Sequence, residues 1–261
     1  MNNATLSEYV EFARETAYQA GQLTLQYYQK ELHPDTKSDG SPVTIADRQA
    51  EQLIRAAIEK RYPGHAILGE EYGSSQDQAA EFRWIIDPID GTKSFVHGVP
   101  LYSVLIGLEI AGKVEVGVVY FPALNEMVSA ATGSGCWWNG RQAHVSPVNQ
   151  LDKSVLSFTD FGAFYKYGGE EAFMRLAQRV AIRAGWTDAY GYALAATGRV
   201  EIMMDPIMAV WDCGPFPPIF AEAGGYFGDW QGNLTIQAGR GLATSQALLP
   251  EVLRVIELSG E

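Results

Sequence analysis

A run of apolar residues that ends in two carboxylates is the part of this sequence best suited to chemistry. The run is W-I-I-D-P-I-D-G-T, residues 84 to 92, and it predicts a buried strand that leads directly into Asp87 and Asp90. The proline between them stiffens the turn, and Gly91 lets another group approach the backbone closely. Thr92 can begin a short helix whose N-terminal N–H groups favour an anion. One loop therefore offers metal ligands and a cradle for a phosphate group.

Three more acidic segments could join this loop. Glu70 and its neighbour Glu71 follow an apolar strand through a glycine, and adjacent side chains there point to opposite sides, so that one can turn toward the loop. Asp47 lies in T-I-A-D, and Asp212 follows the dipeptide Val-Trp. Magnesium takes hard oxygen ligands and keeps several waters, so a few carboxylates and one backbone carbonyl suffice for each ion.

Each of these carboxylates also has a purely structural interpretation. The D-P-I-D-G-T segment could be a plain turn with an Asp cap, and a pair of glutamates is usually a solvated loop. Asp47 could complete a capping box in which Thr44 is the N-cap, and Asp212 could be the N-cap of the helix that follows it. Taken one at a time, the residues leave these alternatives open.

Length and charge limit the classes of protein and partner. With 261 residues, 47% of them hydrophobic and 19% charged, the chain can bury the core of one large α/β domain or of two subdomains that share an interface. A formal net charge of -12, with 19 Lys and Arg residues that form no run, argues against nucleic acid as a partner.

Cysteine content and the N-terminal residues bear on the compartment. Cys136 and Cys213 fit neither a disulfide framework nor a zinc-ligand spacing, which favours a reducing cytoplasm. Glu8, Glu11 and Glu15 interrupt the stretch that a signal peptide would keep apolar, and no segment approaches the ~20 apolar residues of a membrane span. We therefore expect a cytoplasmic protein without a membrane partner.

Periodicity predicts the elements that position the carboxylates. The first half is expected to pack helices on a largely antiparallel sheet: helices over 5–30 and 46–61, strands over 66–68 and 84–86, and a hairpin of 101–110 with 114–121 that is extended by 127–131. Both short strands deliver carboxylates at their C-terminal ends.

The second half is expected to alternate between strands and helices. It is predicted to contain strands over 155–158, 200–204 and 242–244, a helix over 170–183, a helical turn over 190–196 and a closing helix over 250–258. The chain would then consist of an N-terminal α+β subdomain, 1–146, that carries the metal-binding loops, and a C-terminal α/β subdomain, 147–261, that completes the site.

The acidic clusters occur in one order, and together they resemble the inositol monophosphatase superfamily. The superfamily pattern is G-E-E, then W-x-I-D-P-I-D-G-T, then W-D with E-A-G-G about ten residues on, and these stand here at 69–71, 84–92, 211–212 and 222–225. The resemblance spans nearly the whole chain. It implies an α/β (α+β) fold, the layered αβαβα sandwich of the inositol monophosphatase and fructose-1,6-bisphosphatase type, and a Mg2+-dependent phosphomonoesterase.

The resemblance also implies a role for each residue of the pattern. Glu70, Asp87 and the Ile89 carbonyl would bind one metal ion, and Asp87, Asp90 and Asp212 would hold the second. Asp47 would support a further, weaker metal site and take part in catalysis. Thr92 and Glu70 would hold and help deprotonate the attacking water, while the N–H groups of Gly91 and Thr92 bind phosphate. Two ions about 4 Å apart can activate a water and stabilise the leaving alkoxide. Relatives are commonly homodimers and lithium-sensitive.

The residues after G-T narrow the expected substrate. G-T-K-S-F-V-H-G-V-P resembles the histidinol-phosphate phosphatases of the superfamily, as do K-S-D-G-S-P-V-T-x-A-D at 37–47 and D-A-Y-G-Y-x-L-x-A-T-G-R at 188–199. This implies the hydrolysis of histidinol phosphate in histidine biosynthesis. The ammonium and imidazole of that substrate would favour nearby carboxylates, and the resemblance places Asp188 and Asp205 on the substrate side. Their structural interpretations are a helix N-cap and a turn at a strand end.

Two departures from the pattern and two alternatives remain. Thr187 replaces the usual glycine before D-A-Y-G-Y, which predicts a narrower substrate pocket. The segment 214–218, G-P-F-P-P, replaces alanines, which predicts a late helix start and a less exact placement of Asp212.

The first alternative is a phosphatase of this fold for an inositol phosphate, a sugar bisphosphate or a nucleotide 3'-phosphate. The second, a non-catalytic binding protein, is disfavoured because every proposed ligand and Thr92 are present.

Overall fold

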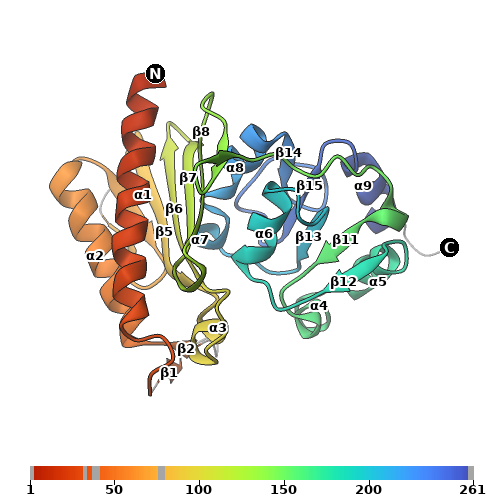
Figure 1. The fold of residues 1–261 in the computed structure, drawn as a ribbon, viewed down its shortest axis with the longest axis horizontal. Helices are drawn as coiled ribbons and strands as arrows, with labels where there is room; N and C mark the ends of the chain where they lie inside the picture. The colour runs from red at the N-terminus through yellow and green to blue at the C-terminus, as the bar shows by residue number, and fades with distance from the viewer. Residues whose placement is uncertain (1–2, 32–33, 37–41, 76–79, 258–261) are drawn as a thin grey trace.

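Five layers of helix and sheet alternate across the protein. The computed structural model describes residues 3–31, 34–36, 42–75 and 80–257. In Figure 1 the layers follow one another from α1 and α2, through an eight-stranded sheet, the middle helices α6, α7 and α8, and a five-stranded sheet, to α5 and α9. The predicted αβαβα sandwich is confirmed.

The eight-stranded sheet has the strand order β10-β9-β8-β7-β6-β5-β3-β4. Its strands are antiparallel except for the parallel pair β3 and β5. The predicted hairpin and its extension are confirmed, and the two turn residues, Ala111 and Gly112, have φ of 50° and 84°, as a tight hairpin requires. The strands are β3 (Ala66–Gly69), β4 (Gly73–Ser74), β5 (Phe82–Asp90), β6 (Ser103–Ile110), β7 (Lys113–Phe121), β8 (Glu126–Ala131), β9 (Cys136–Trp138) and β10 (Arg141–Gln142).

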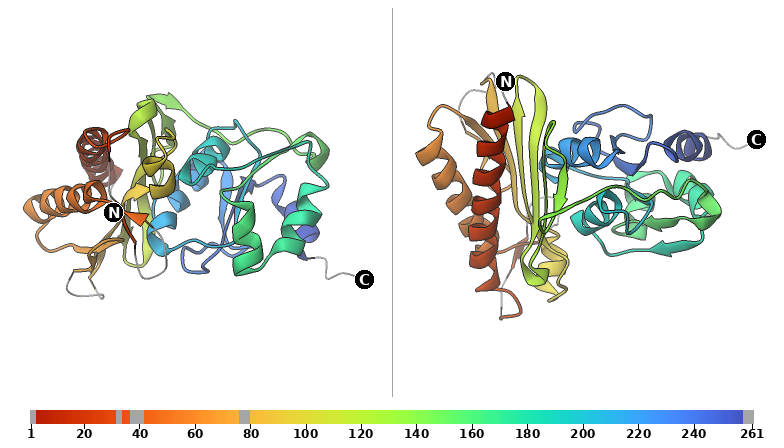
Figure 2. Two further views of the ribbon diagram at one scale, coloured as in Figure 1. Left: turned by 90° about the horizontal axis from the view of Figure 1, so that it is seen from below. Right: turned by 45° about the horizontal axis from the view of Figure 1, so that its top comes forward.

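Two helices cover the outer face of this sheet, as both views in Figure 2 show. The first, α1 (Asn3–Leu25), ends five residues earlier than predicted, because residues 26–28 form turns and Gln29 has a φ of 56°. Its buried alanines, Ala13, Ala17 and Ala20, let it lie close to the sheet. The second, α2 (Ile45–Arg61), follows the N-cap Thr44 and a small pair of strands, β1 (Asp35–Thr36) and β2 (Pro42–Val43).

The five-stranded sheet has the order β12-β11-β13-β15-β14. The prediction of one helix over 170–183 is wrong: α5 (Glu170–Ala177) ends early, and Ile182–Ala184 form the edge strand β12. The reason is that the N–H groups of Ala181 and Ile182 donate to the carbonyl of Ser154. The other elements are β11 (Val155–Ser157), β13 (Ile202–Asp205), β14 (Gly225–Gly228), β15 (Gly241–Ser245), α4 (Phe161–Tyr167) and α9 (Leu249–Glu257).

Three helices fill the space between the sheets: α6 (Ala189–Ala196), α7 (Val210–Cys213) and α8 (Phe216–Ala223). They share one buried cluster with β7 and β8 of the first sheet and β13 and β15 of the second. All strands of the first sheet precede residue 147 and all strands of the second follow it. The boundary between two subdomains stays a prediction, since this shared core joins them.

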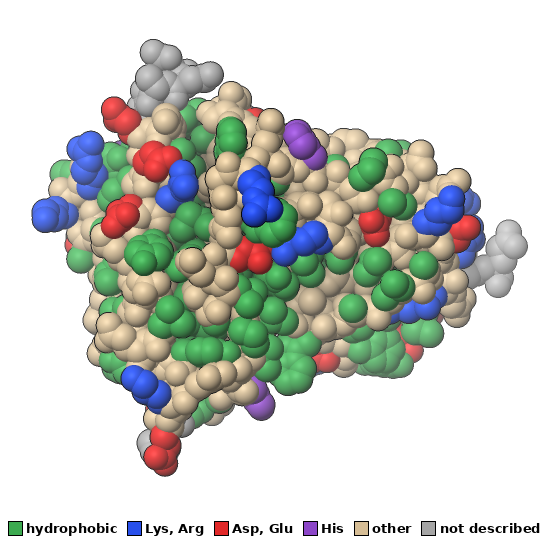
Figure 3. Space-filling model, in the orientation of Figure 1, with side chains coloured by type: hydrophobic (Ala, Val, Ile, Leu, Met, Phe, Trp, Pro, Cys, Tyr) green, Lys and Arg blue, Asp and Glu red, His purple; other side chains and the backbone are tan. Residues whose placement is uncertain are grey.

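The short 3-10 turns Pro122–Leu124 and Leu151–Lys153 and the helix α3 (Thr92–Val96) complete the described elements. None of the described helices is long and apolar enough to cross a membrane. On the face in Figure 3, Lys and Arg side chains are spread out, with acidic side chains among them.

Candidate active site

Two parallel strands bring the first carboxylates together. Leu68 and Gly69 of β3 pair in parallel register with Ile85 and Ile86 of β5, so both strands end at the same edge of the sheet. The Glu70 N–H donates to the Ile86 carbonyl at 3.3 Å, which ties the first loop to the second strand. Burial raises the pKa of Asp87, and the neighbouring Glu70 carboxylate raises it further. Glu70 follows β3 directly and Asp87 lies in the last part of β5, so each strand delivers a carboxylate toward its C-terminal end, as predicted.

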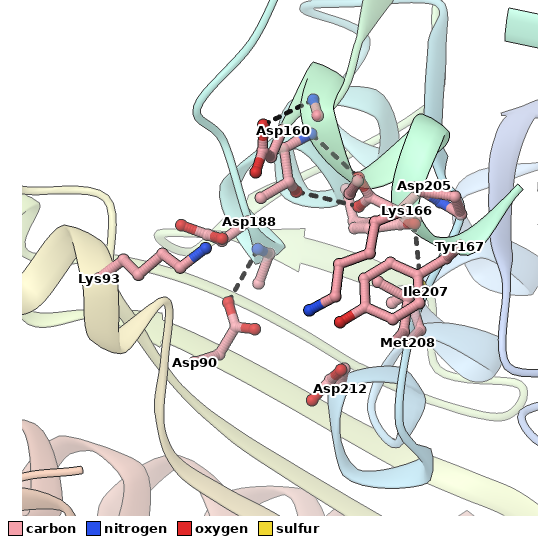
Figure 4. A pocket seen from close by; sticks show the side chains of 16 residues that line it. Asp90, Lys93, Asp160, Lys166, Tyr167, Asp188, Asp205, Ile207, Met208 and Asp212 are labelled. Carbon is pink, nitrogen blue, oxygen red and sulfur yellow. Dashed lines mark hydrogen bonds between the residues drawn. The ribbon is translucent and has the colours of Figure 1, made fainter. Parts of the chain in front are cut away.

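A third segment, far along the chain, completes an acidic cluster. Carboxylate oxygens of Asp87, Asp90 and Asp212 lie within 4.8 Å of one another. Figure 4 shows Asp90 and Asp212 facing the same space from different elements. The alternative interpretation of Asp212, as the N-cap of a following helix, is wrong. Asp212 lies at the third position of α7, where its Oδ2 accepts the N–H of Ala209 at 2.8 Å.

Glycines in the sheet allow α7 and α8 to approach it closely. A Cβ at Gly107 would lie 2.5 Å from the Gly214 carbonyl oxygen, and one at Gly117 would lie 1.9 Å from that of Pro215. The helical segment that contains Asp212 is interrupted at Gly214 and Pro215, and α8 begins only at Phe216, as the expected late helix start requires. The prolines of α8 occupy its first turn, where N–H groups have no intrahelical partner. This packing places Asp212 beside the end of β5.

Mutual repulsion and burial both disfavour the charged form of the cluster. Burial is the main cause that raises the pKa of Asp87 and Asp90 well above the ordinary range and that of Asp212 to about 7, and the neighbouring carboxylates add to it. Closely spaced carboxylate oxygens of this kind are hard ligands that fit a divalent cation such as Mg2+.

Asp47 serves the helix cap and the site at the same time. Its Oδ2 accepts the N–H of Thr44 at 2.8 Å and the hydroxyl of Thr44 at 2.6 Å, which is the predicted capping box. The Thr92 hydroxyl lies 3.3 Å from its Oδ1 and 3.2 Å from the Ile89 carbonyl oxygen. Burial raises the pKa of Asp47. The two interpretations of Asp47 are therefore compatible.

Gly91 and Thr92 form the start of α3, as predicted. Gly91 is the N-cap with a φ of 79°, a conformation that favours glycine. A Cβ there would also lie 2.8 Å from the Asp188 Oδ2, so the glycine is needed for the approach of the second half of the chain. The catalytic, metal-binding and phosphate-binding roles of these residues stay predictions, although the structure brings all of them together.

Asp188 reaches this site through a strained backbone. Its φ of 44° and ψ of -140° lie outside the usual regions, and such strain is often found at functional sites. The Ser94 hydroxyl donates to its Oδ2 at 2.9 Å, and the next residue, Ala189, donates its N–H to Asp90 Oδ2 at 2.8 Å. Burial raises the pKa of Asp188, while the nearby charge of Lys93 lowers it.

Asp205 lies at the end of β13, before Pro206. Its two oxygens accept the N–H of Thr159 at 2.9 Å and the hydroxyl of Thr159 at 3.1 Å, and burial raises its pKa to about 7. The predicted strand-end turn is therefore present. Asp205 and Asp188 line a cavity of about 470 Å³ together with Asp90 and Asp212. A hollow of about 570 Å³, which shares Asp90, Asp188 and Asp212, is lined by Glu70, Asp87, Ile89, Gly91 and Thr92.

The expectation that Thr187 narrows the pocket is wrong. Thr187 is buried, and its hydroxyl contacts the Phe158 carbonyl and the Ser157 hydroxyl, both at 3.1 Å. It does not line either hollow. Residues 37–41 of the K-S-D-G-S-P segment, quoted above as a substrate signature, lie outside the described residues.

The sequence did not single out three residues that line the cavity. Lys93 and Lys166 direct their amino groups into it from two sides, and Asp160 lies at its rim (Figure 4). Asp160 is the N-cap of α4, where its Oδ1 accepts the N–H of Gly162 at 2.8 Å. The T-D-F-G sequence contains a cap signal that could have indicated this helix. Nothing local indicates that α4 faces the carboxylates.

Comparisons with known proteins agree with the geometry. A model of the inositol monophosphatase family matches residues 5–260. The chain is 41% identical over 237 residues to a histidinol-phosphatase of Chlorobaculum parvum, covering 90% of this chain and 91% of that protein. It is 38% identical over 228 residues to a histidinol-phosphatase of Mycobacterium tuberculosis, covering 85% and 87%. A solved inositol monophosphatase from Anabaena matches with a TM-score of 0.87 and 30% identity, covering 98% of both chains.

The family match extends over both sheets and all the carboxylate loops, and the pattern of motifs agrees with it. This chain is a member of the inositol monophosphatase family, whose members are Mg2+-dependent phosphatases of small phosphate esters.

Proposed function

We propose that this phosphatase hydrolyses histidinol phosphate to histidinol and phosphate. The observation that carries the proposal is the position of Asp188 beside the acidic cluster. Its carboxylate lines the same cavity as Asp90 and Asp212, and the cavity continues to Asp205 and Asp160. An alcohol with an ammonium group and an imidazole would find carboxylates there, and charge-assisted hydrogen bonds are the strong ones. The relatives named histidinol-phosphatase support the same choice.

The residues of the first sheet would act on the phosphate group. Glu70, Asp87, the Ile89 carbonyl, Asp90 and Asp212 would hold two Mg2+ ions, with a third, weaker site near Asp47. Bound metal ions neutralise charge on the phosphate and polarise water. Thr92 would orient the attacking water through its hydroxyl, and Asp47, which lies 3.3 Å from that hydroxyl, could receive its proton. The N–H groups of Gly91 and Thr92 would orient the phosphate oxygens.

A second candidate substrate is a phosphate ester whose alcohol carries another anion, such as a sugar bisphosphate. The observation that favours it is the pair of amino groups of Lys93 and Lys166, which approach the cavity from opposite walls (Figure 4). The inositol monophosphatase from Anabaena makes an inositol phosphate a third candidate. Asp160, Asp188 and Asp205 outnumber the two lysines, and we therefore place histidinol phosphate first.

Initial rates on these substrates, measured side by side, test the proposal. Histidinol phosphate, inositol 1-phosphate and a sugar bisphosphate would be compared at saturating Mg2+, with p-nitrophenyl phosphate as a reference that carries no ammonium. We expect the highest kcat/KM for histidinol phosphate. A higher kcat/KM for inositol 1-phosphate or the bisphosphate would overturn this substrate and leave the phosphatase assignment in place.

A further inference from the structure

Helix α2 carries three charged residues at intervals of four, Asp47, Glu51 and Arg55, and this spacing places them on one face of the helix. Asp47 contacts Thr92. Glu51, one turn further on, is fully buried. A buried carboxylate is unfavourable by several kcal/mol unless its charge is paired and its oxygens accept hydrogen bonds. The partners of Glu51 therefore indicate what this residue does.

Those partners belong to the loop that carries Glu70. The N–H of Glu71 donates to Glu51 Oε2 at 2.7 Å, and the N–H of Tyr72 donates to Oε1 at 3.1 Å. Arg55 donates from Nε to the same Oε1 at 2.8 Å, and its Nη2 donates to the carbonyl of Gly73. The Glu51 and Arg55 side chains thus bind both sides of the turn between β3 and β4.

Every backbone N–H of this three-residue turn has a defined acceptor. Glu70 donates to Ile86 of β5, and the next two residues donate to Glu51. Gly69 lets the carboxylate come this close, because a Cβ there would lie 2.2 Å from Glu51 Oε1. The φ of Gly69 is not in the left-handed region, so contact with Glu51 is the reason for a glycine at this position.

We propose that Glu51, paired with Arg55, is a positioning residue that holds Glu70 against Asp87 and so sets the affinity of the site for divalent metal. The inference rests on the family's metal-dependent activity and on Glu70 as a metal ligand, and it does not depend on the choice of histidinol phosphate. Glu51 holds Glu70 through the backbone N–H groups of the next two residues. Groups outside the ligand shell orient metal ligands, and their loss typically weakens metal binding about 10–100-fold.

The charge of Arg55 explains why Glu51 can be buried beside the turn that carries Glu70. The turn contains Glu70 and lies next to Asp87, whose ionisation is already disfavoured by burial and by the neighbouring carboxylates. Arg55 compensates the charge of Glu51, so the support adds no net negative charge behind the metal ligands. A glutamine would keep the volume of Glu51, but its NH2 group would face one of the two backbone donors and lose that contact.

The protein contains a matched control for this arrangement. Glu222 of α8 also accepts two backbone N–H groups of a turn, from Gly133 to Oε1 and from Gly135 to Oε2, both at 2.7 Å. It is less buried than Glu51, and it does not line the hollows that contain the acidic cluster. Glu51→Gln and Glu222→Gln therefore make a similar change at the metal site and away from it.

Titration of substrate-free protein with Mn2+ and Mg2+, by calorimetry, provides a readout that is independent of activity. We expect Glu51→Gln to weaken metal binding about 10–100-fold and Glu222→Gln to leave it within about twofold. The thermal unfolding temperature of the metal-free proteins reports how much each change costs the fold. Unchanged metal affinity in folded Glu51→Gln, or an equal loss in both variants, would overturn the proposal.

Two further variants keep the test decisive. In a Glu70→Gln background, Glu51→Gln should add little to the loss of metal affinity, because two residues that act through one contact are not additive. A full additional loss would show that Glu51 does not act through Glu70. If Glu51→Gln does not fold, Gly69→Ala takes its place, since a methyl group there displaces the Glu51 carboxylate without changing a charged residue. Unchanged metal affinity in Gly69→Ala would then overturn the proposal.

Discussion

The two sides of the cavity hold their carboxylates in different ways. On the side of the eight-stranded sheet, backbone N–H groups donate to a single oxygen of each aspartate: Oδ1 of Asp87, Oδ2 of Asp90 and Oδ2 of Asp212. On the side of the five-stranded sheet, both oxygens of Asp205 accept hydrogen bonds from Thr159. The first group leaves oxygens to face one another at 4.8 Å or less, whereas Asp205 is satisfied by the protein itself.

This difference distinguishes carboxylates that require a bound metal ion from carboxylates that are available to contact a substrate. Three close carboxylates with raised pKa values require protons or a cation between them. Asp205 and Asp188 accept hydrogen bonds from hydroxyl or N–H donors of the protein, so their charge does not require a metal ion. Loss of charge on the first side should therefore affect turnover on every substrate, and loss of charge on the second side should depend on the substrate.

The largest effect is expected from Asp90→Asn. Asparagine keeps the shape and can still accept the N–H of Ala189, but it removes a full charge from the metal site. Bound metal contributes several kcal/mol to transition-state stabilisation, so kcat should fall about a hundredfold or more on all substrates. Steady-state kinetics on p-nitrophenyl phosphate and histidinol phosphate would measure this. A folded variant with full activity would remove Asp90 from the site.

The second expected effect concerns the pH dependence of metal-free stability. The pKa of Asp212 is about 7 in the folded protein and its ordinary value is 3.8. Between these values the folded state holds a proton that the unfolded chain has released, so stability is lost as the pH rises toward 7. Mg2+ binds the deprotonated carboxylates and should therefore restore the lost folding stability, which is on the order of a few kcal/mol.

Thermal unfolding at pH 5.5 and pH 8 with and without Mg2+ would test this. The rise in Tm on adding Mg2+ should be several degrees larger at pH 8, since ~1 kcal/mol corresponds to roughly 2–4 °C in a protein of this size. Asp90→Asn, with one carboxylate fewer, serves as the control and should show a smaller difference between the two pH values. Equal rises at both values in the wild type would contradict the expectation.

The metal side could be predicted from the sequence because its residues follow strand ends. Glu70 and Asp87 come directly after apolar runs, and parallel pairing of those runs is sufficient to bring them together. Asp47 was ambiguous from its local sequence, since a capping box and a site residue require the same aspartate. The contact with Thr92 resolves the ambiguity, and only the fold supplies it.

The other side could be predicted less well because its geometry depends on distant contacts and unusual backbone. Asp188 has a φ of 44° and its side chain lies against Gly91, and no local signal in the sequence indicates either feature. The predicted helix over 170–183 is too long, because the N–H groups of Ala181 and Ile182 donate to the carbonyl of Ser154 and not to a helical carbonyl. Glu51 was missed although it stands four residues after Asp47 on the same helical face, a spacing that could have indicated it.

Asp188→Asn tests the substrate side, with a smaller expected effect. Asparagine tolerates the positive φ and can still accept from Ser94, so the fold should persist. A charge-assisted contact to the ammonium contributes roughly 1.5–3 kcal/mol, and its loss should lower kcat/KM for histidinol phosphate about ten- to a hundredfold. The rate on p-nitrophenyl phosphate should change much less. Asp205→Asn, measured in parallel, shows which of the two aspartates contacts the ammonium.

Equal losses on both substrates would assign these aspartates to the metal site or to the fold. Circular dichroism and the Tm of each variant separate the last two cases. A folded Asp188→Asn with an unchanged preference for histidinol phosphate would contradict its role as a substrate contact.

The smallest effect on catalysis is expected from Thr187→Gly, which introduces the residue that the family resemblance leads one to expect at this position. Because the Thr187 hydroxyl is buried against Phe158 and does not line the cavity, the ratio of kcat/KM for histidinol phosphate to that for inositol 1-phosphate should stay within about twofold, well below the 10–200-fold that pocket contacts typically confer. Stability should change instead, by about 1–2 kcal/mol, since the variant loses a hydrogen bond and gains backbone freedom beside the strained Asp188. Thr187→Ser keeps the hydroxyl and should retain most of the Tm. A large change in this kcat/KM ratio with an unchanged Tm would show that Thr187 shapes the substrate pocket, as Asp188 and Asp205 are expected to do.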